Sequence, residues 1–132
     1  MRSVDTRVKI KNWPDTAELI RSLTSDASKG VVVTGFFDPL LAEHARRLEE
    51  IAAVRGRVVV ALNDAPAALL PARTRAELLA GLRAVDTVLL PPPTGLQTRL
   101  AALPRGLVIR EEGSDERRRE DLIRRVRQKH GL

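Results

Sequence analysis

Two uninterrupted runs of valine constrain the fold of this chain more than any other feature. Residues 30–35 have the sequence GVVVTG, and residues 57–64 have the sequence RVVVALND. A half-exposed strand alternates apolar and polar residues, whereas a short continuous β-branched run is typical of a strand that is buried on both faces. Both runs therefore predict central strands of a parallel sheet that helices cover on both sides.

The chain contains two further apolar runs besides the two valine runs. Amphipathic segments with helical spacing alternate with these four runs. Asp15 is expected to cap the first helix, and Ser114 or Asp115 the last one. The expected helices are residues 16–23, 39–54, 73–85, 95–103 and 114–130, and the expected additional strands are residues 86–90 and 106–112.

This alternation predicts a Rossmann-like three-layer α/β/α fold with a mainly parallel sheet of about four to five strands. The length of 132 residues suits a single domain over residues 1–132. In such sheets the ligand site lies beyond the carboxyl ends of the strands, where the strand order reverses. The stretches expected at this rim are residues 35–38, 63–64, 90–93 and 110–113.

Composition narrows the classes of partner. The formal charge of +6, from 23 Lys and Arg against 17 Asp and Glu, favours anionic partners such as nucleotides, phosphorylated sugars or nucleic acid. Trp13, Phe36 and Phe37 are the only aromatic residues, so stacking platforms for single-stranded nucleic acid are scarce. The absence of cysteine excludes a thiol nucleophile and a Cys-ligated zinc site.

No membrane or secretory segment is expected. Residues 1–11 are charged and lack the apolar core of a signal peptide, and no apolar stretch approaches the roughly 20 residues of a membrane span. We therefore expect a cytoplasmic protein without a membrane partner.

The turn GFFDPLLAEH at residues 35–44 joins the first valine strand to a helix. Asp38 is expected to cap that helix, with Pro39 at its first position. The free N–H groups of this turn would then form a positive concavity suited to phosphate. A turn that only leaves a strand and caps a helix would use the same residues. His44 lies on the face of Leu41 and could point at a phosphate, although a lone helical histidine is commonly a packing residue.

Residues 31–51 resemble the first motif of the cytidylyltransferase-like nucleotidyltransferases. The resemblance is strongest to the adenylyltransferase domain of the bifunctional heptose-phosphate kinase/adenylyltransferases. In that motif a strand is followed by Thr or Asn, then Gly, any one residue, Phe-Asp, any two residues and His-x-Gly-His. A helix comes next. The residues that match it are Thr34, Gly35, Phe37, Asp38 and His44. The resemblance continues through residues 57–64, 73–90 and 106–113, where Arg75 takes the position of a helix arginine and Arg110 that of a strand lysine.

The resemblance implies transfer of a nucleoside monophosphate from CTP or ATP to a sugar or polyol phosphate, with the aid of Mg²⁺. His44 is implied as the catalytic residue that stabilises the transferring phosphate. No metal-ligating residue is implied, and the family's common dimers allow a homodimer here. The implied nucleotide-binding or phosphate-binding residues are Thr34, Gly35, Phe36, Phe37, Asp38, Asn63, Asp64, Arg75 and Arg110.

Several positions depart from the family pattern. Leu41 replaces the first histidine, and loss of one such donor typically lowers the rate about 10²- to 10³-fold. Glu43 replaces the glycine and brings a negative charge toward the phosphates, unless it faces solvent or binds a divalent cation. Glu111 and Glu112 replace a glycine pair, and Ser114 is the single hydroxyl of a turn that is normally rich in Ser and Thr.

Three hypotheses follow. The chain is a nucleotidyltransferase with an eroded motif, or it is a catalytically inactive relative that serves as a nucleotide-binding or scaffolding domain. The third and least favoured hypothesis is a nucleic-acid-binding domain that uses the basic residues of the last helix. Glu120 and Asp121 each precede an arginine by four residues, which favours helix pairs on a solvated face. Leu122, Ile123 and Val126 form an apolar stripe that is expected to dock on the sheet.

Overall fold

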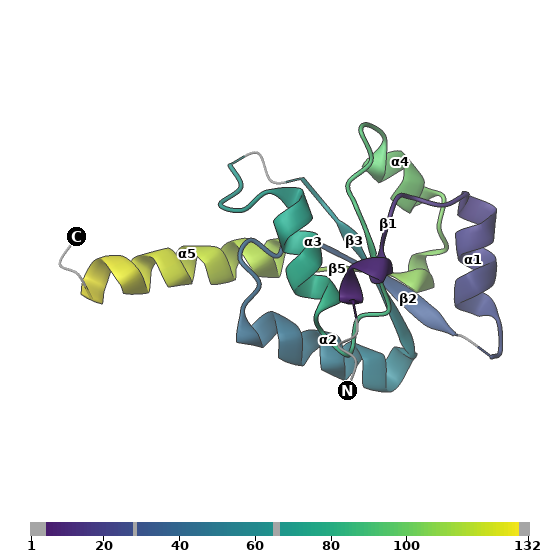
Figure 1. The fold of residues 1–132 in the computed structure, drawn as a ribbon, viewed down its shortest axis with the longest axis horizontal. Helices are drawn as coiled ribbons and strands as arrows, with labels where there is room; N and C mark the ends of the chain where they lie inside the picture. Colours follow the sequence, from purple (N-terminus) through teal and green to yellow (C-terminus); the bar gives the residue numbers. More distant parts are fainter. Residues whose placement is uncertain (1–4, 28, 65–66, 130–132) are drawn as a thin grey trace.

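The computed structural model describes residues 5–27, 29–64 and 67–129, and these residues contain a five-stranded sheet in which every pairing is parallel (Figure 1). The strand order is β1-β4-β3-β2-β5. The predicted three-layer α/β Rossmann-like fold is therefore confirmed. The strands are β1 (Ile10–Lys11), β2 (Gly30–Gly35), β3 (Arg57–Leu62), β4 (Thr87–Leu89) and β5 (Val108–Arg110).

The two valine runs form the centre of the sheet. β2 and β3 lie side by side, with Val32 opposite Val59, and their valines are at most 2% exposed. Alternate side chains point to opposite faces, so Val31 and Val33 enter one hydrophobic core and Val32 enters the other. Continuous burial of both faces is the reason that these strands contain no alternating polar residues.

Helices cover both faces of the sheet. α2 and α3 supply side chains to one core, and α1 and α4 supply side chains to the other, in agreement with their places in Figure 1. The strand order reverses at β2, because β3 and β5 lie on its two sides. The carboxyl ends of β2 and β5 therefore define the crevice in which a ligand is expected. The helices are α1 (Thr16–Thr24), α2 (Ala42–Arg55), α3 (Ala72–Ala80), α4 (Leu96–Ala101) and α5 (Glu112–Lys129), with 3₁₀ turns η1 (Thr6–Lys9) and η2 (Arg105–Leu107).

The predicted start of α2 is wrong. The helix begins at Ala42 with Leu41 as its N-cap, so Pro39 lies outside it. Asp38 does not cap α2. Its carboxylate instead accepts the backbone N–H groups of Leu69 and Leu70 at 2.6 and 2.8 Å. Asp38 therefore joins the turn after β2 to the loop before α3, a partner 31 residues away that local sequence does not indicate.

Other elements also differ from the expectation: α3 ends at Ala80, five residues before the expected end, and β5 is shorter than the strand expected over residues 106–112. β1 was not expected, because two residues beside β4 are too short to show a periodic pattern. α5 begins at Glu112, so neither Ser114 nor Asp115 is its N-cap. Asp15 is the N-cap of α1 as predicted, and it accepts the N–H groups of Ala17 and Glu18.

The expected docking of the α5 apolar stripe on the sheet is wrong. Figure 1 shows that α5 leads away from the sheet after its first turns. Residues 124–129 are all exposed, and Val126 is 47% exposed. On this helix Asp121 pairs with Arg124, three residues away, at 3.5 Å. His130, which the sequence places in this helix, lies outside the described residues.

No helix within the described part of the chain combines the length and the apolar character that crossing a membrane requires.

Candidate functional site

The carboxyl ends of β2, β3 and β5 bring together several residues that the sequence indicated. Thr34 pairs in register with Ala61 on one side and with Arg110 on the other. Gly35 ends β2, and its carbonyl accepts the N–H of Asn63 at 2.9 Å. The N–H of Glu111 donates to the carbonyl of Thr34 at 2.8 Å. The turn after β2 and the start of α5 therefore meet at the crevice.

A carboxylate of the protein itself lies in this crevice. Glu112 Oε2 accepts a hydrogen bond from Thr34 Oγ1 at 2.8 Å. Its other oxygen, Oε1, accepts from Asn63 Nδ2 at 3.4 Å. Thr34 and Asn63 are among the residues that the family resemblance implied for binding a nucleotide or phosphate. In the structure these donors bind the first residue of α5.

A second carboxylate lies beside the first. Glu111 is 7% exposed, and its Oε1 accepts from Arg47 Nε on α2 at 2.8 Å. A buried carboxylate needs such a partner, because an unpaired charge is strongly disfavoured away from water. Sequence reasoning did not find Arg47. The available signal was Glu111 itself, an acidic residue directly after β5, whose burial requires a cation from a neighbouring element.

Arg75 positions loops at the rim. It is 1% exposed, and its Nε donates to the carbonyl of Leu70 at 3.1 Å. Its Nη1 donates to the carbonyls of Phe36 and Asn63 at 2.9 and 3.0 Å. One guanidinium thus links the turn after β2, the end of β3 and the loop before α3. Nη2 lies 4.0 Å from the exposed carboxylate of Asp64.

The side chain of His44 is buried at the start of α2. It is 2% exposed, and its Nδ1 accepts the backbone N–H of Leu41 at 2.9 Å. An Nδ1 that accepts has no proton, so a neutral ring carries its proton on Nε2. The ring also meets Phe37 edge to face, with 5.3 Å between the centroids. Phe37 is 1% exposed and has a φ of 48°, a left-handed conformation that is uncommon for a residue with a side chain.

Leu41 and Glu43 border a groove between the start of α2 and α5. Glu43 Oε2 lies 3.4 Å from Arg118 Nε, so this carboxylate pairs with a cation of the protein. The groove encloses about 170 Å³, which is below the roughly 300 Å³ at which small-molecule pockets begin. Its lining residues are Leu41, Ala42, Glu43, Arg46, Arg118, Asp121, Leu122 and Arg125.

Arg110 lies beside Thr34 in the sheet, but its side chain contacts α4. Its Nη1 donates to Gln97 Oε1 on α4 at 3.0 Å. It also lines a cavity of about 480 Å³ beside β5, together with Leu100 and Val108. Arg110 therefore faces α4, whereas Glu112 faces Thr34 and Asn63.

The described residues do not form a set of ligands for the Mg²⁺ that the resemblance implies. Among residues 5–27, 29–64 and 67–129, no group of three or more His, Asp or Glu side chains could hold a metal ion. The carboxylates nearest the crevice, Glu111 and Glu112, already accept hydrogen bonds from Arg47, Thr34 and Asn63.

A comparison of the chain with models of protein families gave no match, and a comparison with curated proteins gave none either.

Proposed function

We propose that this protein is a non-catalytic relative of the nucleotidyltransferases that serves as a binding or scaffolding domain. The observation that carries the proposal is the position of Glu112. Its carboxylate accepts hydrogen bonds from Thr34 and Asn63, the donors that the family pattern would offer to a nucleotide phosphate. The chain thus supplies its own anion at the crevice. This internal carboxylate favours the hypothesis of an inactive relative over that of an enzyme.

Charge opposes a nucleotide at this place. A triphosphate in the crevice would approach the carboxylates of Glu111 and Glu112, and like charges within a few ångströms repel. Displacement of Glu112 would break its hydrogen bonds with Thr34 and Asn63. Arg75 offers little compensation, because three of its hydrogen bonds go to backbone carbonyls.

The groups that would stabilise a transferring phosphate are also changed. Leu41 has no donor. His44 is buried, and its Nδ1 is bonded to the backbone of its own helix. Loss of one well-placed donor alone lowers a rate about 10²- to 10³-fold in comparable sites.

The test is calorimetric titration with ATP and with CTP, each with Mg²⁺, together with an assay of pyrophosphate release in the presence of sugar and polyol phosphates. We expect neither saturable binding at millimolar nucleotide nor release of pyrophosphate. Saturable binding with pyrophosphate release that His44→Ala abolishes would establish the enzyme instead.

Variants then test the role of the internal carboxylate. Glu112→Gln removes the charge and keeps an oxygen that can accept from Thr34. Combined with Leu41→His and Glu43→Gly, it should give measurable nucleotide binding. Glu50→Gln, an exposed position on α2, is the matched control and should leave the chain without binding. A combined variant that folds and still fails to bind would contradict the view that Glu112 occupies a former nucleotide site.

A further inference from the structure

The projecting part of α5 concentrates positive charge. Residues 117–129 contain seven basic residues and two acidic ones, Glu120 and Asp121. The interleaving with acidic residues ends at Asp121, because residues 122–129 contain four basic residues and no acidic one. This outer segment is also the part of the helix that leads away from the sheet in Figure 1.

Packing within the protein accounts for the inner cations of α5 and leaves the outer ones in solvent. Arg118 lies 3.4 Å from Glu43, and Arg119 Nη2 donates to the carbonyl of Ala67 at 3.3 Å. Arg124 lies 3.5 Å from Asp121. Arg125 and residues 126–129 beyond it are exposed. These exposed cations do not stabilise the helix through one another, because like charges on one helix repel.

The exposed charges continue a stripe that starts on the body of the protein. Arg118, Arg125 and Lys129 follow one another at intervals of seven and four residues, so they share one side of α5. Arg46 of α2 lines the same groove as Arg118 and Arg125. Glu43 and Asp121 are the acidic residues of that groove, and they pair with Arg118 and Arg124, respectively. From Arg118 to Lys129 the stripe extends about 16 Å along the helix axis, at about 1.5 Å per residue.

Double-stranded DNA is the polyanion that this geometry fits. A helix of about 10 to 12 Å diameter matches the width of the DNA major groove, whereas the major groove of RNA is too narrow for side chains to enter. Single strands are bound largely by stacking on aromatic rings, and α5 has none. Ile123 and Val126 are too small an apolar face for a helix that inserts into a membrane surface.

We propose that the outer half of α5 lies in the major groove of double-stranded DNA and, together with Arg46, binds the phosphate backbone at the groove edges without sequence preference. Arg118 already pairs with Glu43, so contact with about three phosphates, one for each of Arg46, Arg125 and Lys129, gives a slope of about −2.7 for log K against log salt concentration. Affinity should then fall about 40-fold between about 50 and 200 mM salt.

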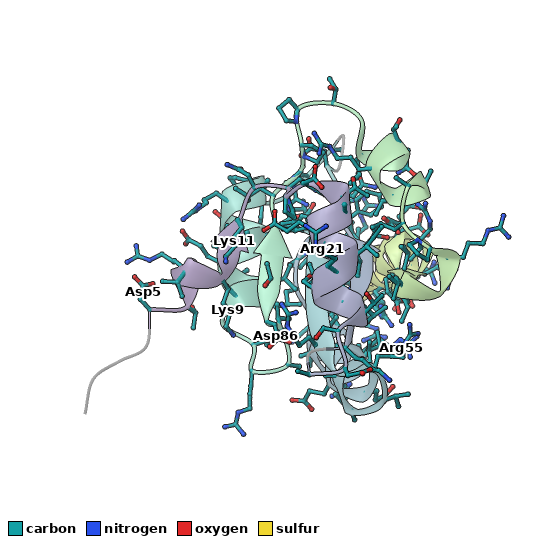
Figure 2. The ribbon with its side chains drawn as sticks, turned by 90° about the vertical axis from the view of Figure 1, so that its right-hand side faces the viewer. Asp5, Lys9, Lys11, Arg21, Arg55 and Asp86 are labelled. Atoms are coloured by element: carbon teal, nitrogen blue, oxygen red, sulfur yellow. The ribbon has the colours of Figure 1, made fainter. Side chains whose placement is uncertain are left out.

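The experiment measures the fluorescence anisotropy of a labelled DNA duplex of about two helical turns, titrated with the whole chain over this range of salt. Arg125→Gln with Lys129→Gln should reduce the slope by about 1.8 and weaken binding at low salt by more than about tenfold. The matched control is Lys11→Gln with Arg21→Gln, which removes the same charge. Figure 2 shows Lys11 and Arg21 on the side that lies opposite the projecting end of α5 in Figure 1.

Four outcomes would overturn the proposal. They are absence of duplex binding at low salt, an equal loss in both double variants, binding of a single strand as tightly as the duplex, and binding of anionic phospholipid vesicles in place of DNA. An equal loss in both variants would assign the effect to net charge alone. None of these outcomes depends on nucleotide binding, so this proposal stands or fails separately from the proposed function.

Discussion

The carboxyl rim of the sheet and the outer half of α5 are both rich in charged residues. At the rim Arg75 and Glu111 are buried and contact the protein, whereas the charged residues of the outer half of α5 are exposed to solvent. At the rim, Arg75 is 1% exposed and Glu111 is 7% exposed, and both contact other parts of the chain. On α5, residues 124–129 are exposed. Charged residues of the first kind hold loops in place, and those of the second kind remain accessible to a partner.

This difference shows that the type of a charged residue does not reveal its role. Arg75 and Arg125 are equally cationic, and the sequence offered both as candidates for binding anions. Burial separates them, because a buried guanidinium must find acceptors within the protein whereas an exposed one is solvated by water. Variants at the two regions should therefore affect different measurements.

The largest expected effect on stability is at Arg75. Arg75→Met leaves the carbonyls of Phe36, Asn63 and Leu70 without this donor and should lower the free energy of unfolding by about 3 kcal/mol. Urea denaturation measures the loss. Arg73→Met is the control on the same helix, where the arginine is exposed and pairs with Glu77, and it should change stability by less than about 0.5 kcal/mol. An equal loss of stability in the two variants would contradict the view that the buried arginine at the rim holds loops in place and the exposed one does not.

A smaller loss is expected at His44. His44→Ala removes the acceptor for the Leu41 N–H and the ring contact with Phe37, which together should lower the free energy of unfolding by about 2 kcal/mol. Glutamine is a usual residue at this position of a capping box, so His44→Gln should recover part of the loss. Thermal or urea unfolding of the two variants separates the contributions. Full stability of His44→Ala would show that the ring does not cap the helix.

A third prediction concerns the hydroxyl that binds Glu112. Thr34→Val keeps the β-branched shape in a fully buried strand and removes the donor, so stability should fall by about 1.5 kcal/mol, the size expected for a hydrogen bond to a charged group. Thr87→Val, at the half-buried first residue of β4, is the control and should have little effect. A Thr34→Val protein as stable as the parent would mean that Glu112 does not occupy the crevice in solution.

The smallest effect on stability is expected on α5. Arg125→Gln with Lys129→Gln should change the free energy of unfolding by less than about 0.5 kcal/mol, since exposed positions without packing contacts rarely matter to folding. Urea denaturation of the double variant and the parent provides the comparison. A larger loss would indicate that the outer turns of α5 pack against the protein.

The local pattern indicated the sheet and its helices well but their ends poorly. The valine runs predicted β2 and β3, because burial on both faces leaves a signature within six residues. The start of α2 was misplaced by three residues, since Asp38 is a good N-cap by type and is drawn instead to Leu69 and Leu70. Leu122, Ile123 and Val126 suggested docking, but three apolar residues on a highly charged helix do not determine its direction.

By itself, the sequence determined the parallel α/β fold, because hydrophobic burial is recorded in short, regular patterns along the chain. It also located the rim and named Thr34, Asn63 and Arg75 there. Only the tertiary structure decided the partner of each charged group. Glu112 meets Thr34 across 78 residues of chain, and Glu111 meets Arg47 across 64. A charge can pair with any opposite charge or donor that the fold brings near it, so its partner depends on position in space and leaves no periodic mark in the sequence.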